Sequence, residues 1–276
     1  MELATLLEQR FAMPSIPKVM ALLMSELVGN RQDLRRIDLL LGSDPALATR
    51  VLQAANAPMF KLAGQIHSVA EALVVLRLGQ VQAMVSQATS QASFKAVPGL
   101  LLPKFWAYSQ DTARVSRSLA GLLRLNQQAA TSCGLIHAVG ELAMRLAMPQ
   151  AVALDATCPV FELKRERLEI QTFGFGYTQV SAGLAAQWHF PALLVNALAF
   201  AHVPFDNNAY EPLAGVLHLA IWRARAKQLG LAPNALAVSF PSPVAEVLGL
   251  DIDMVLQQDP IDWSKQVPGS RFAELP

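Results

Sequence analysis

Charged residues are scarce in this chain, and neither sign of charge dominates. They make up 16% of the 276 residues, against 53% for hydrophobic residues, and the formal net charge is +1. An intrinsically disordered chain needs the opposite balance of charge and hydrophobicity, so this class is excluded. Nucleic-acid-binding proteins usually concentrate basic residues in one stripe that neutralises phosphates. Here the basic residues are mixed with acidic ones along the chain, and we predict no nucleic-acid partner.

Cysteine and long apolar runs are also nearly absent. The two cysteines, Cys133 and Cys158, lack metal-ligand spacing and are too few for a disulfide scaffold. The longest apolar stretches, such as "PALLVNALAFAHVP", are shorter than the roughly 20 residues that a membrane-spanning helix needs. The first residues, "MELATLLEQR", lack the basic-then-apolar order of a signal peptide. We therefore expect a cytoplasmic protein with no membrane partner.

Strand-like alternation of apolar and polar residues is likewise missing, whereas helix signals recur. Asp33 and Asp44 each precede an apolar segment with helical periodicity, as N-cap residues do, and Pro45 suits the first helical position. Ser68 and Glu71 have the spacing of a capping box, in which each side chain bonds the other residue's backbone N–H. These signals predict an all-α fold.

The helical pattern is interrupted once, by "KAVPGLLLPK" at residues 95–104, which contains two prolines and a glycine. We predict a boundary there, between an N-terminal helical bundle over residues 1–98 and a second helical lobe over 99–276. Two short helices are expected in the tail. The other expected helices, besides those described above, cover about 80–94, 105–125, 128–148, 160–171, 175–188, 191–202 and 211–229.

Seven stretches, taken in order, carry a resemblance to a known family. They are "MPSIPKVMALL", "SDPALATRVLQAANAPMF", "IHSVAEALVVLRLGQVQAMV", "FWAYSQDTARVSRSLAGLL", "GLIHAVGELAMRLA", "FGFGYTQVSAGLAAQWHFP" and "VNALAFAHVP". Together they resemble the HDOD family, bacterial signalling modules related to the HD-type metal phosphohydrolases, over about residues 13–222. The resemblance implies an N-terminal helical bundle packed on an HD-like helical lobe, and bacterial signal transduction as the context.

The resemblance also locates the positions at which HD-type phosphohydrolases bind one or two divalent metals. Here these positions hold Tyr108, His137, Ala138, Tyr177, Ala201, His202 and Ile221. Two histidines remain, but no carboxylate stands at any of the seven positions. A hydrolytic metal site normally has at least three protein ligands, and imidazoles alone do not neutralise a hard divalent cation. We therefore predict a degenerate site without metal, cofactor or catalytic activity, in which His137 is held by packing.

Two further charged features, Glu141 and a basic cluster near the end of the chain, are interpreted as structural. Glu141 follows His137 by four residues, so within one helix the two side chains would share a face, but no third ligand accompanies them. A short basic cluster later in the chain is typical of a solvated helix face. It comprises Arg223, Arg225 and Lys227.

Several polar residues remain candidates for contact with a ligand or partner. An asparagine at the end of a helix often adopts the left-handed cap conformation, and a binding contact is the alternative for Asn56. Arg114 and Arg117 follow the first metal position and could pair with phosphates, or lie on a solvated face. The candidate contacts are Asn56, Arg114, Arg117, His137 and His202.

Three functions are compatible with these features. The favoured hypothesis is a non-catalytic signalling module that recognises a partner protein, such as a sensor kinase, a response regulator or a cyclic-dinucleotide enzyme. The alternative is a sensor that binds a nucleotide or cyclic dinucleotide in the former active-site cleft without hydrolysing it. A residual metal phosphohydrolase is the third hypothesis, and the missing carboxylates argue against it.

Overall fold

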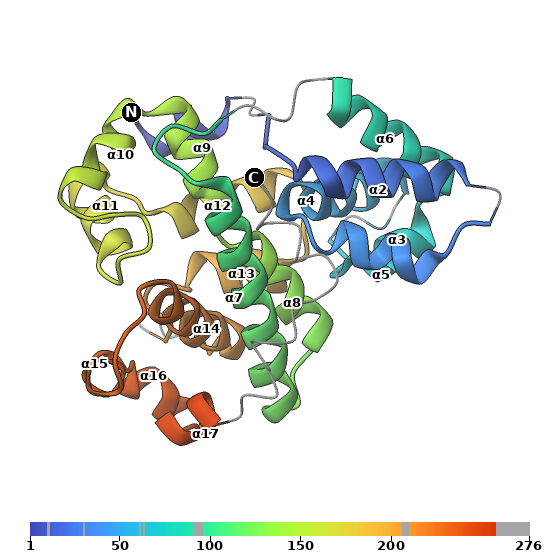
Figure 1. Ribbon diagram of the computed structural model, residues 1–276. Coiled ribbons are helices and arrows are strands. Elements are labelled where there is room, and N and C mark those ends of the chain that lie inside the picture. Colours follow the sequence, from blue (N-terminus) through green and yellow to red (C-terminus); the bar gives the residue numbers. More distant parts are fainter. Residues whose placement is uncertain are drawn as a thin grey trace.

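The computed structural model describes residues 1–9, 12–29, 31–60, 62, 64–90, 96–205 and 210–257. Within these ranges every regular element is a helix, which confirms the predicted all-α fold. Figure 1 shows the bundle of α2 to α6 on one side and a larger group of helices, α7 to α17, on the other. The two groups meet where α4 of the bundle packs against α7 and α8.

The N-terminal bundle owes its stability to apolar faces that meet in one core. Leu23 and Leu27 of α2, Ile37 and Leu41 of α3 and Leu47 of α4 are all almost completely buried. The bundle comprises α2 (Pro17–Val28), α3 (Leu34–Leu41), α4 (Pro45–Ala55), the short 3₁₀ helix η1 (Pro58–Phe60), α5 (Val69–Val75) and α6 (Leu78–Ser90).

The second lobe is built around a pair of long helices, α7 (Leu102–Leu122) and α14 (Pro212–Gln228), which pack against each other and against α8. The other elements are α8 (Gln127–Ile136), α9 (Val139–Ala147), α10 (Pro149–Ala153), the 3₁₀ helix η2 (Leu154–Ala156), α11 (Arg165–Phe173), α12 (Tyr177–Gln187), α13 (Ala192–Ala199), α15 (Pro233–Ser239), α16 (Ser242–Val247) and α17 (Ile252–Gln257).

The first helix, α1 (Leu3–Leu7), belongs in space to the second lobe, although it precedes the bundle in sequence. It packs against α9 and α12, as Figure 1 also shows. Leu6 is fully buried, and Leu7 lies so close to Gly183 that a Cβ at that glycine would clash with it. The N-terminal segment thus ties the bundle to the lobe from the outside, which the sequence boundary did not predict.

The predicted N-caps are present. The Asp33 carboxylate accepts from the first turn of α3, and Asp44 does the same for α4. Asp44 also accepts from the backbone N–H of Ile16 at 2.5 Å, so one buried carboxylate fixes two segments of the bundle. Ser68 caps α5 through Glu71 N–H, but the Glu71 carboxylate accepts from the N–H of His67 rather than from that of Ser68.

The helix expected over residues 128–148 is wrong, because the chain breaks at His137–Ala138 into α8 and α9. A Cβ at Gly134 would clash with the backbone of α7, and one at Gly140 with the backbone of α12, so each helix packs closely on a different neighbour. Ser181 of α12 supplies hydrogen-bond partners to the backbone at this break. Its hydroxyl donates to the carbonyl oxygen of His137 and accepts from the N–H of Gly140. The expectation that Glu141 shares a helical face with His137 therefore also fails.

The remaining helices follow the expected order, with α16 and α17 as the two short helices of the tail. The short elements α10, η2 and α15 were not predicted, since each spans two turns or fewer and offers little periodicity. The end of the helix expected at 80–94, and the start of the predicted boundary segment at residue 95, lie outside the described residues.

Among the helices described, none alone combines the length and the apolar character needed to cross a membrane. One pair, Val69–Val75 with Leu78–Thr89, meets that criterion jointly by length and composition, but it is bent by 118° at the junction.

Candidate functional site

The seven predicted metal positions fall into two adjacent groups inside the second lobe. Tyr108 of α7, His137 and Ala138 at the α8–α9 break and Tyr177 at the start of α12 are all buried and converge on one another. We call Tyr108, His137, Tyr177 and the neighbouring Phe161 the aromatic cluster. The second group lines a separate cavity beside α14. It consists of Ala201, His202 and Ile221.

The aromatic cluster is packed edge to face. The ring centroids of Tyr108 and His137 are 4.8 Å apart, those of His137 and Tyr177 6.1 Å, and those of Tyr108 and Phe161 5.3 Å. Such T-shaped pairs contribute about 0.5–1.5 kcal/mol each beyond their buried area. The space left beside the two tyrosines is only about 10 Å³, about the volume needed for the centre of one water molecule. The cluster therefore has room for no larger ligand.

His137 is completely buried and electrically neutral. Its Nδ1 lies 2.7 Å from the carbonyl oxygen of Gly134, which can only accept, so Nδ1 carries the proton. Nε2 is buried without a hydrogen-bond partner among the described residues. Burial is the main reason that the pKa of His137 falls from 6.5 to about 3, with the charge of Arg225 acting in the same direction. The imidazole is thus packed as an uncharged core residue at neutral pH.

A guanidinium group lies beside this aromatic cluster, and it corrects our interpretation of the basic residues at 223–227 as a solvated helix face. Arg225 of α14 is 4% exposed rather than solvated. Its Nε donates to the Tyr108 hydroxyl at 3.2 Å and its Nη1 to the carbonyl oxygen of Glu162 at 3.1 Å. Its Cζ lies 5.9 Å from the ring centroid of Tyr108 and 5.3 Å from that of Tyr177, within cation–π range.

The position of Arg225 could have been inferred from its spacing. It follows Ile221 by four residues, so in an α-helix it shares a face with the predicted position of the last aspartate. It is also flanked by Ala224 and Ala226, which lie in the core. Lys227 of the same cluster donates to the buried carboxylate of Asp111 at 2.8 Å, so it too has an internal partner.

Glu166 of α11 is a second buried charge that the sequence did not reveal. Its carboxylate accepts from the backbone N–H and the hydroxyl of Thr178, in the first turn of α12, and lies 3.6 Å from Nδ1 of His202. Burial raises the pKa of Glu166, but its bonds from His202 and Thr178 and the charge of Arg225 outweigh this, and the pKa ends below its usual value. Glu166 and Arg225 are therefore buried groups of opposite charge, and each favours the ionised form of the other.

These two charges face the cavity that holds the second group of predicted positions. We call this cavity, lined by Ala201, His202 and Ile221 among others, the α14 cleft; its volume is about 170 Å³. His218 borders it and is neutral, because burial lowers its pKa, while its Nδ1 bonds the carbonyl oxygen of Ala201. The outer wall comes from the α15–α16 connection, where the Ser239 hydroxyl accepts from the indole N–H of Trp222. The lining residues used in this argument are Glu166, His202, His218, Trp222, Arg225 and Ser239.

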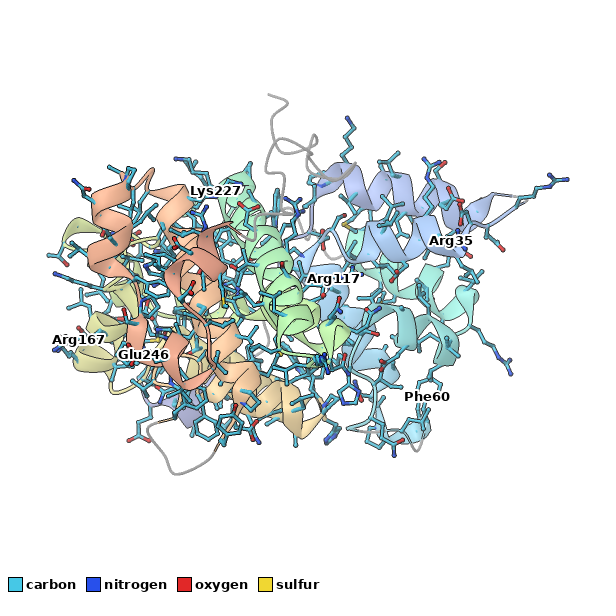
Figure 2. All side chains as sticks on the ribbon, turned by 90° about the horizontal axis from the view of Figure 1, so that it is seen from below. Arg35, Phe60, Arg117, Arg167, Lys227 and Glu246 are labelled. Carbon is cyan, nitrogen blue, oxygen red and sulfur yellow. The ribbon has the colours of Figure 1, made fainter. Side chains whose placement is uncertain are left out.

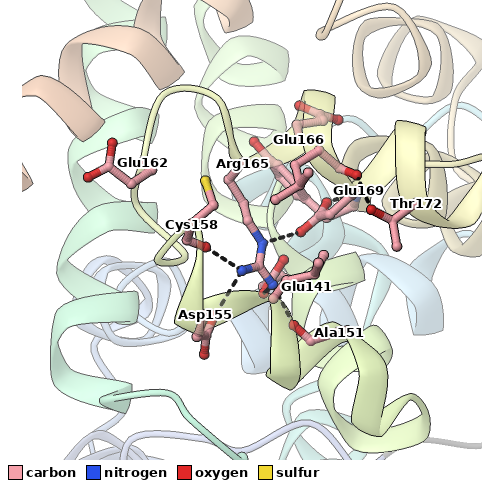
Figure 3. A network of polar contacts seen from close by, with 12 residues as sticks. Glu141, Ala151, Asp155, Cys158, Glu162, Arg165, Glu166, Glu169 and Thr172 are labelled. Carbon is pink, nitrogen blue, oxygen red and sulfur yellow. Dashed lines mark hydrogen bonds and ion pairs between the residues drawn. The ribbon is translucent and has the colours of Figure 1, made fainter.

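The segment from α10 to α11 brings Phe161 against Tyr108 of the aromatic cluster, and an ionic network holds this segment in place (Figure 3). Arg165 donates to the carboxylates of Asp155 at 2.8 Å and Glu169 at 2.7 Å, and to the carbonyl oxygens of Ala151 and Cys158. Arg145 of α9 binds the same Asp155 through two hydrogen bonds. Phe161 and the carbonyl group of Glu162, which contact Tyr108 and Arg225, belong to this fastened segment.

The network brings more carboxyl groups than guanidinium groups into one site. Two buried guanidinium groups, those of Arg145 and Arg165, face three carboxyl groups. Burial and the neighbouring Glu141 carboxylate raise the pKa of Glu169 well above its ordinary value. A buried cluster of this kind is tolerated only when its charges are paired, and the two guanidinium groups supply that pairing.

The remaining predicted contact residues lie elsewhere. Arg114 and Arg117 line a different cavity, between the bundle and the second lobe, so the structure does not bring them together with His202. Asn56 does cap α4, but with φ −86° it is not in the left-handed conformation that we expected. Its amide makes four hydrogen bonds, with Leu52, Gly64 and Ile66, which use all of its donors and acceptors.

The donor set at the aromatic cluster does not fit a metal ion. It offers one imidazole nitrogen and two phenols, and burial raises the pKa of Tyr108 and of Tyr177, so both stay protonated. The nearby cation, Arg225, would repel a second positive charge. Across the described part of the chain, no group of three or more His, Cys, Asp or Glu side chains is placed to hold a metal.

Comparison with known proteins defines the class to which this fold and site belong. The sequence profile of the HDOD domain matches residues 13–204, more than two thirds of the chain, and confirms the resemblance seen in the motifs. The chain belongs to the HDOD family. An uncharacterized protein of Treponema pallidum (strain Nichols) is 22% identical over 216 residues, 75% of this chain. This chain spans only 41% of the length of that relative.

Solved structures share the fold at low sequence identity. The MmoQ response regulator of Methylococcus capsulatus superposes with a TM-score of 0.70 at 22% identity, over 89% of this chain and 96% of that one. A virulence factor of Campylobacter jejuni gives 0.63 at 17% identity, over 88% and 96%. An HDOD domain protein with unknown function from Geobacter sulfurreducens gives 0.51 at 20% identity, over 95% and 92%.

Proposed function

We propose that the chain is a non-catalytic regulatory module of bacterial signal transduction, which acts in the cytoplasm by binding a partner protein. The observation that carries this proposal is Arg225. Its guanidinium group lies against the aromatic cluster, where the HD-type phosphohydrolases would hold a metal, and hydrogen bonds and ring contacts fix it there. A permanent cation supplies charge but no open coordination position, so it can neither polarise a phosphoryl group nor activate a water molecule.

The family and one neighbouring structure support a class of partner. HDOD domains are signalling modules, and one of the similar structures is described as a response regulator. We therefore propose a sensor kinase, a response regulator or a cyclic-dinucleotide enzyme as the partner. The low charge content of the chain supports recognition through apolar surface, because the centres of protein–protein interfaces are depleted in charge.

Two measurements on the purified full chain test this proposal. The first is a phosphodiesterase assay with manganese, in which we expect no turnover. The second is co-purification from the native cells with a tag, followed by mass spectrometry, in which we expect a signalling protein in stoichiometric amount. Metal-dependent turnover that His137→Ala abolishes would overturn the proposal.

A nucleotide sensor is the second candidate, and the α14 cleft is the observation that favours it. The cleft presents a guanidinium group, two imidazoles and an indole around about 170 Å³. The phosphate-binding role considered for Arg114 and Arg117 does not support it, because both lie in another cavity. Calorimetry with cyclic di-GMP and with guanine nucleotides separates the two candidates, since only the sensor gives heat of binding. We expect none.

A further inference from the structure

The cavity that holds Arg114 and Arg117 lies at the junction of the two lobes. Its walls come from α3 and α5 of the bundle and from α7 and α8 of the second lobe, and its volume is about 200 Å³. We call it the interlobe groove. Figure 2 shows Arg117 at this junction, on the side of the molecule where α7 meets the bundle. The site described above shares helix α7 with the groove but none of its lining residues.

Most of the surface inside the groove is apolar by area, although serine, threonine and glutamine side chains also line it, and the apolar surface continues out of it. Leu39 of α3 lines the groove yet is 59% exposed. Ala70 of α5 lines it as well, and Val74, one turn further along the same helical face, is 87% exposed. Single exposed apolar side chains are ordinary, but here they extend a hollow that is itself apolar, which is typical of a surface that another molecule covers.

The second-lobe edge of the groove is basic. Arg114 and Arg117 stand on successive turns of α7, about 5–6 Å apart at their Cβ atoms. Arg114 forms an ion pair with Asp111, with Nη1 3.3 Å from Oδ1. In contrast, no hydrogen bond or ion pair of Arg117 with a described residue is found. The acidic residue in the lining is Asp38, half-buried, and its raised pKa, caused by burial, reflects the poor solvation of the groove. The edge thus carries more positive than negative charge.

We propose that the interlobe groove binds an amphipathic helix of the partner protein, with an apolar side chain in the groove and carboxylates facing Arg114 and Arg117. The inference rests on the proposed function and names the surface that performs it. Carboxylates spaced three or four residues apart on a helix match the spacing of the two arginines, and arginine binds carboxylates with two parallel hydrogen bonds. Because both lobes line the groove, the bound helix also bridges them.

Site-specific photo-crosslinking in the native cells tests the inference. A benzophenone amino acid replaces Leu39 in the full chain, and the crosslinked peptide is sequenced by mass spectrometry. We expect a peptide of another protein that has apolar residues at helical spacing and at least two carboxylates. Arg117→Glu should lower the crosslinking yield at least tenfold, and reversing a facing carboxylate of the partner to arginine should restore it. The matched control Arg167→Glu, on an exposed position of α11, should change the yield less than twofold.

A second benzophenone at Val238 of α15, which is 89% exposed, separates this inference from the proposed function. Partner crosslinks from Val238 with none from Leu39 overturn the groove while leaving a protein-binding module standing. Crosslinks from neither position overturn both. A Leu39 crosslink to a second copy of this chain, or one that Arg117→Glu leaves unchanged, also overturns the inference.

Discussion

Helix α7 borders two regions that differ in packing, the tightly packed aromatic cluster and the open interlobe groove. At the cluster, Tyr108 meets a guanidinium group whose contacts all lie within the second lobe, and the remaining space is about 10 Å³. At the groove, two turns further along, Arg117 makes no hydrogen bond or ion pair with any residue that the structure describes, although its charge acts on Asp38, and the space is about 200 Å³. A charge that is buried with its partners stabilises the fold. A charge at the rim of an apolar hollow remains available to another molecule.

The largest effect is expected where the segment from α10 to α11 is fastened. Arg165→Met removes a buried cation that binds both Glu169 and Asp155, and of these two carboxyl groups only Asp155 keeps a second guanidinium partner among the described residues, Arg145. Breaking a buried ion pair on one side costs about 3–5 kcal/mol, so we expect a loss of that size in the free energy of unfolding, measured with urea. Arg167→Met, exposed two residues away, is the control and should stay within about 0.5 kcal/mol. A loss below about 1 kcal/mol for Arg165→Met would show that the network does not hold the segment.

The second effect concerns the cation of the cluster itself. Arg225→Met removes two hydrogen bonds from a charged donor and the cation beside Glu166, and we expect a loss of about 2–3 kcal/mol in the free energy of unfolding. Arg225→Lys keeps the charge without the planar fork and should give an intermediate loss. If both variants unfold like the parent chain, the guanidinium group is not an integral part of the site.

The third effect depends on pH. The folded-state pKa of His137, about 3, lies below its unfolded value of about 6.5. The unfolded chain therefore binds the proton first, and stability that is present above pH 6.5 is lost as the pH falls toward 3. His137→Leu removes this loss, so the variant should match the parent within about 1 kcal/mol at pH 7.5 and exceed it by about 2 kcal/mol at pH 5. Urea unfolding at both pH values measures the difference, and a pH-independent difference would refute the neutral, buried imidazole.

The smallest effect is expected at the groove. Arg117→Gln removes an exposed guanidinium group that forms no ion pair within the described ranges, and the free energy of unfolding should change by less than about 0.5 kcal/mol. The same substitution raises the pKa of Asp38 further, because the charge of Arg117 opposes the effect of burial on that carboxyl. A loss above about 1 kcal/mol, measured by urea unfolding at pH 7, would mean that Arg117 serves the fold rather than a partner.

The sequence predicted what depends on local pattern. The caps at Asp33 and Asp44, the helical class and the family all follow from short stretches of residues, and the structure confirms them. The break at His137–Ala138 could not be predicted, because it depends on the packing of Gly134 and Gly140 against two distant helices.

The sequence also did not predict which charged side chains are buried. In the sequence Arg225 is one of three basic residues close together, and only the fold shows that Tyr108, Tyr177 and Glu166 surround it, from three other helices. Likewise, Arg114 and Arg117 lie close in sequence to Tyr108, and only the fold shows that they line a cavity next to the bundle rather than the aromatic cluster.

Metal content is the most direct test of the central claim that a guanidinium group stands where the HD-type phosphohydrolases hold their metal. The full chain is incubated with manganese, iron or zinc, freed of unbound ions and measured by mass spectrometry of the elements. We predict metal far below one equivalent per chain for each ion. One tightly bound equivalent per chain, lost in His137→Ala together with phosphodiesterase turnover, would contradict the account.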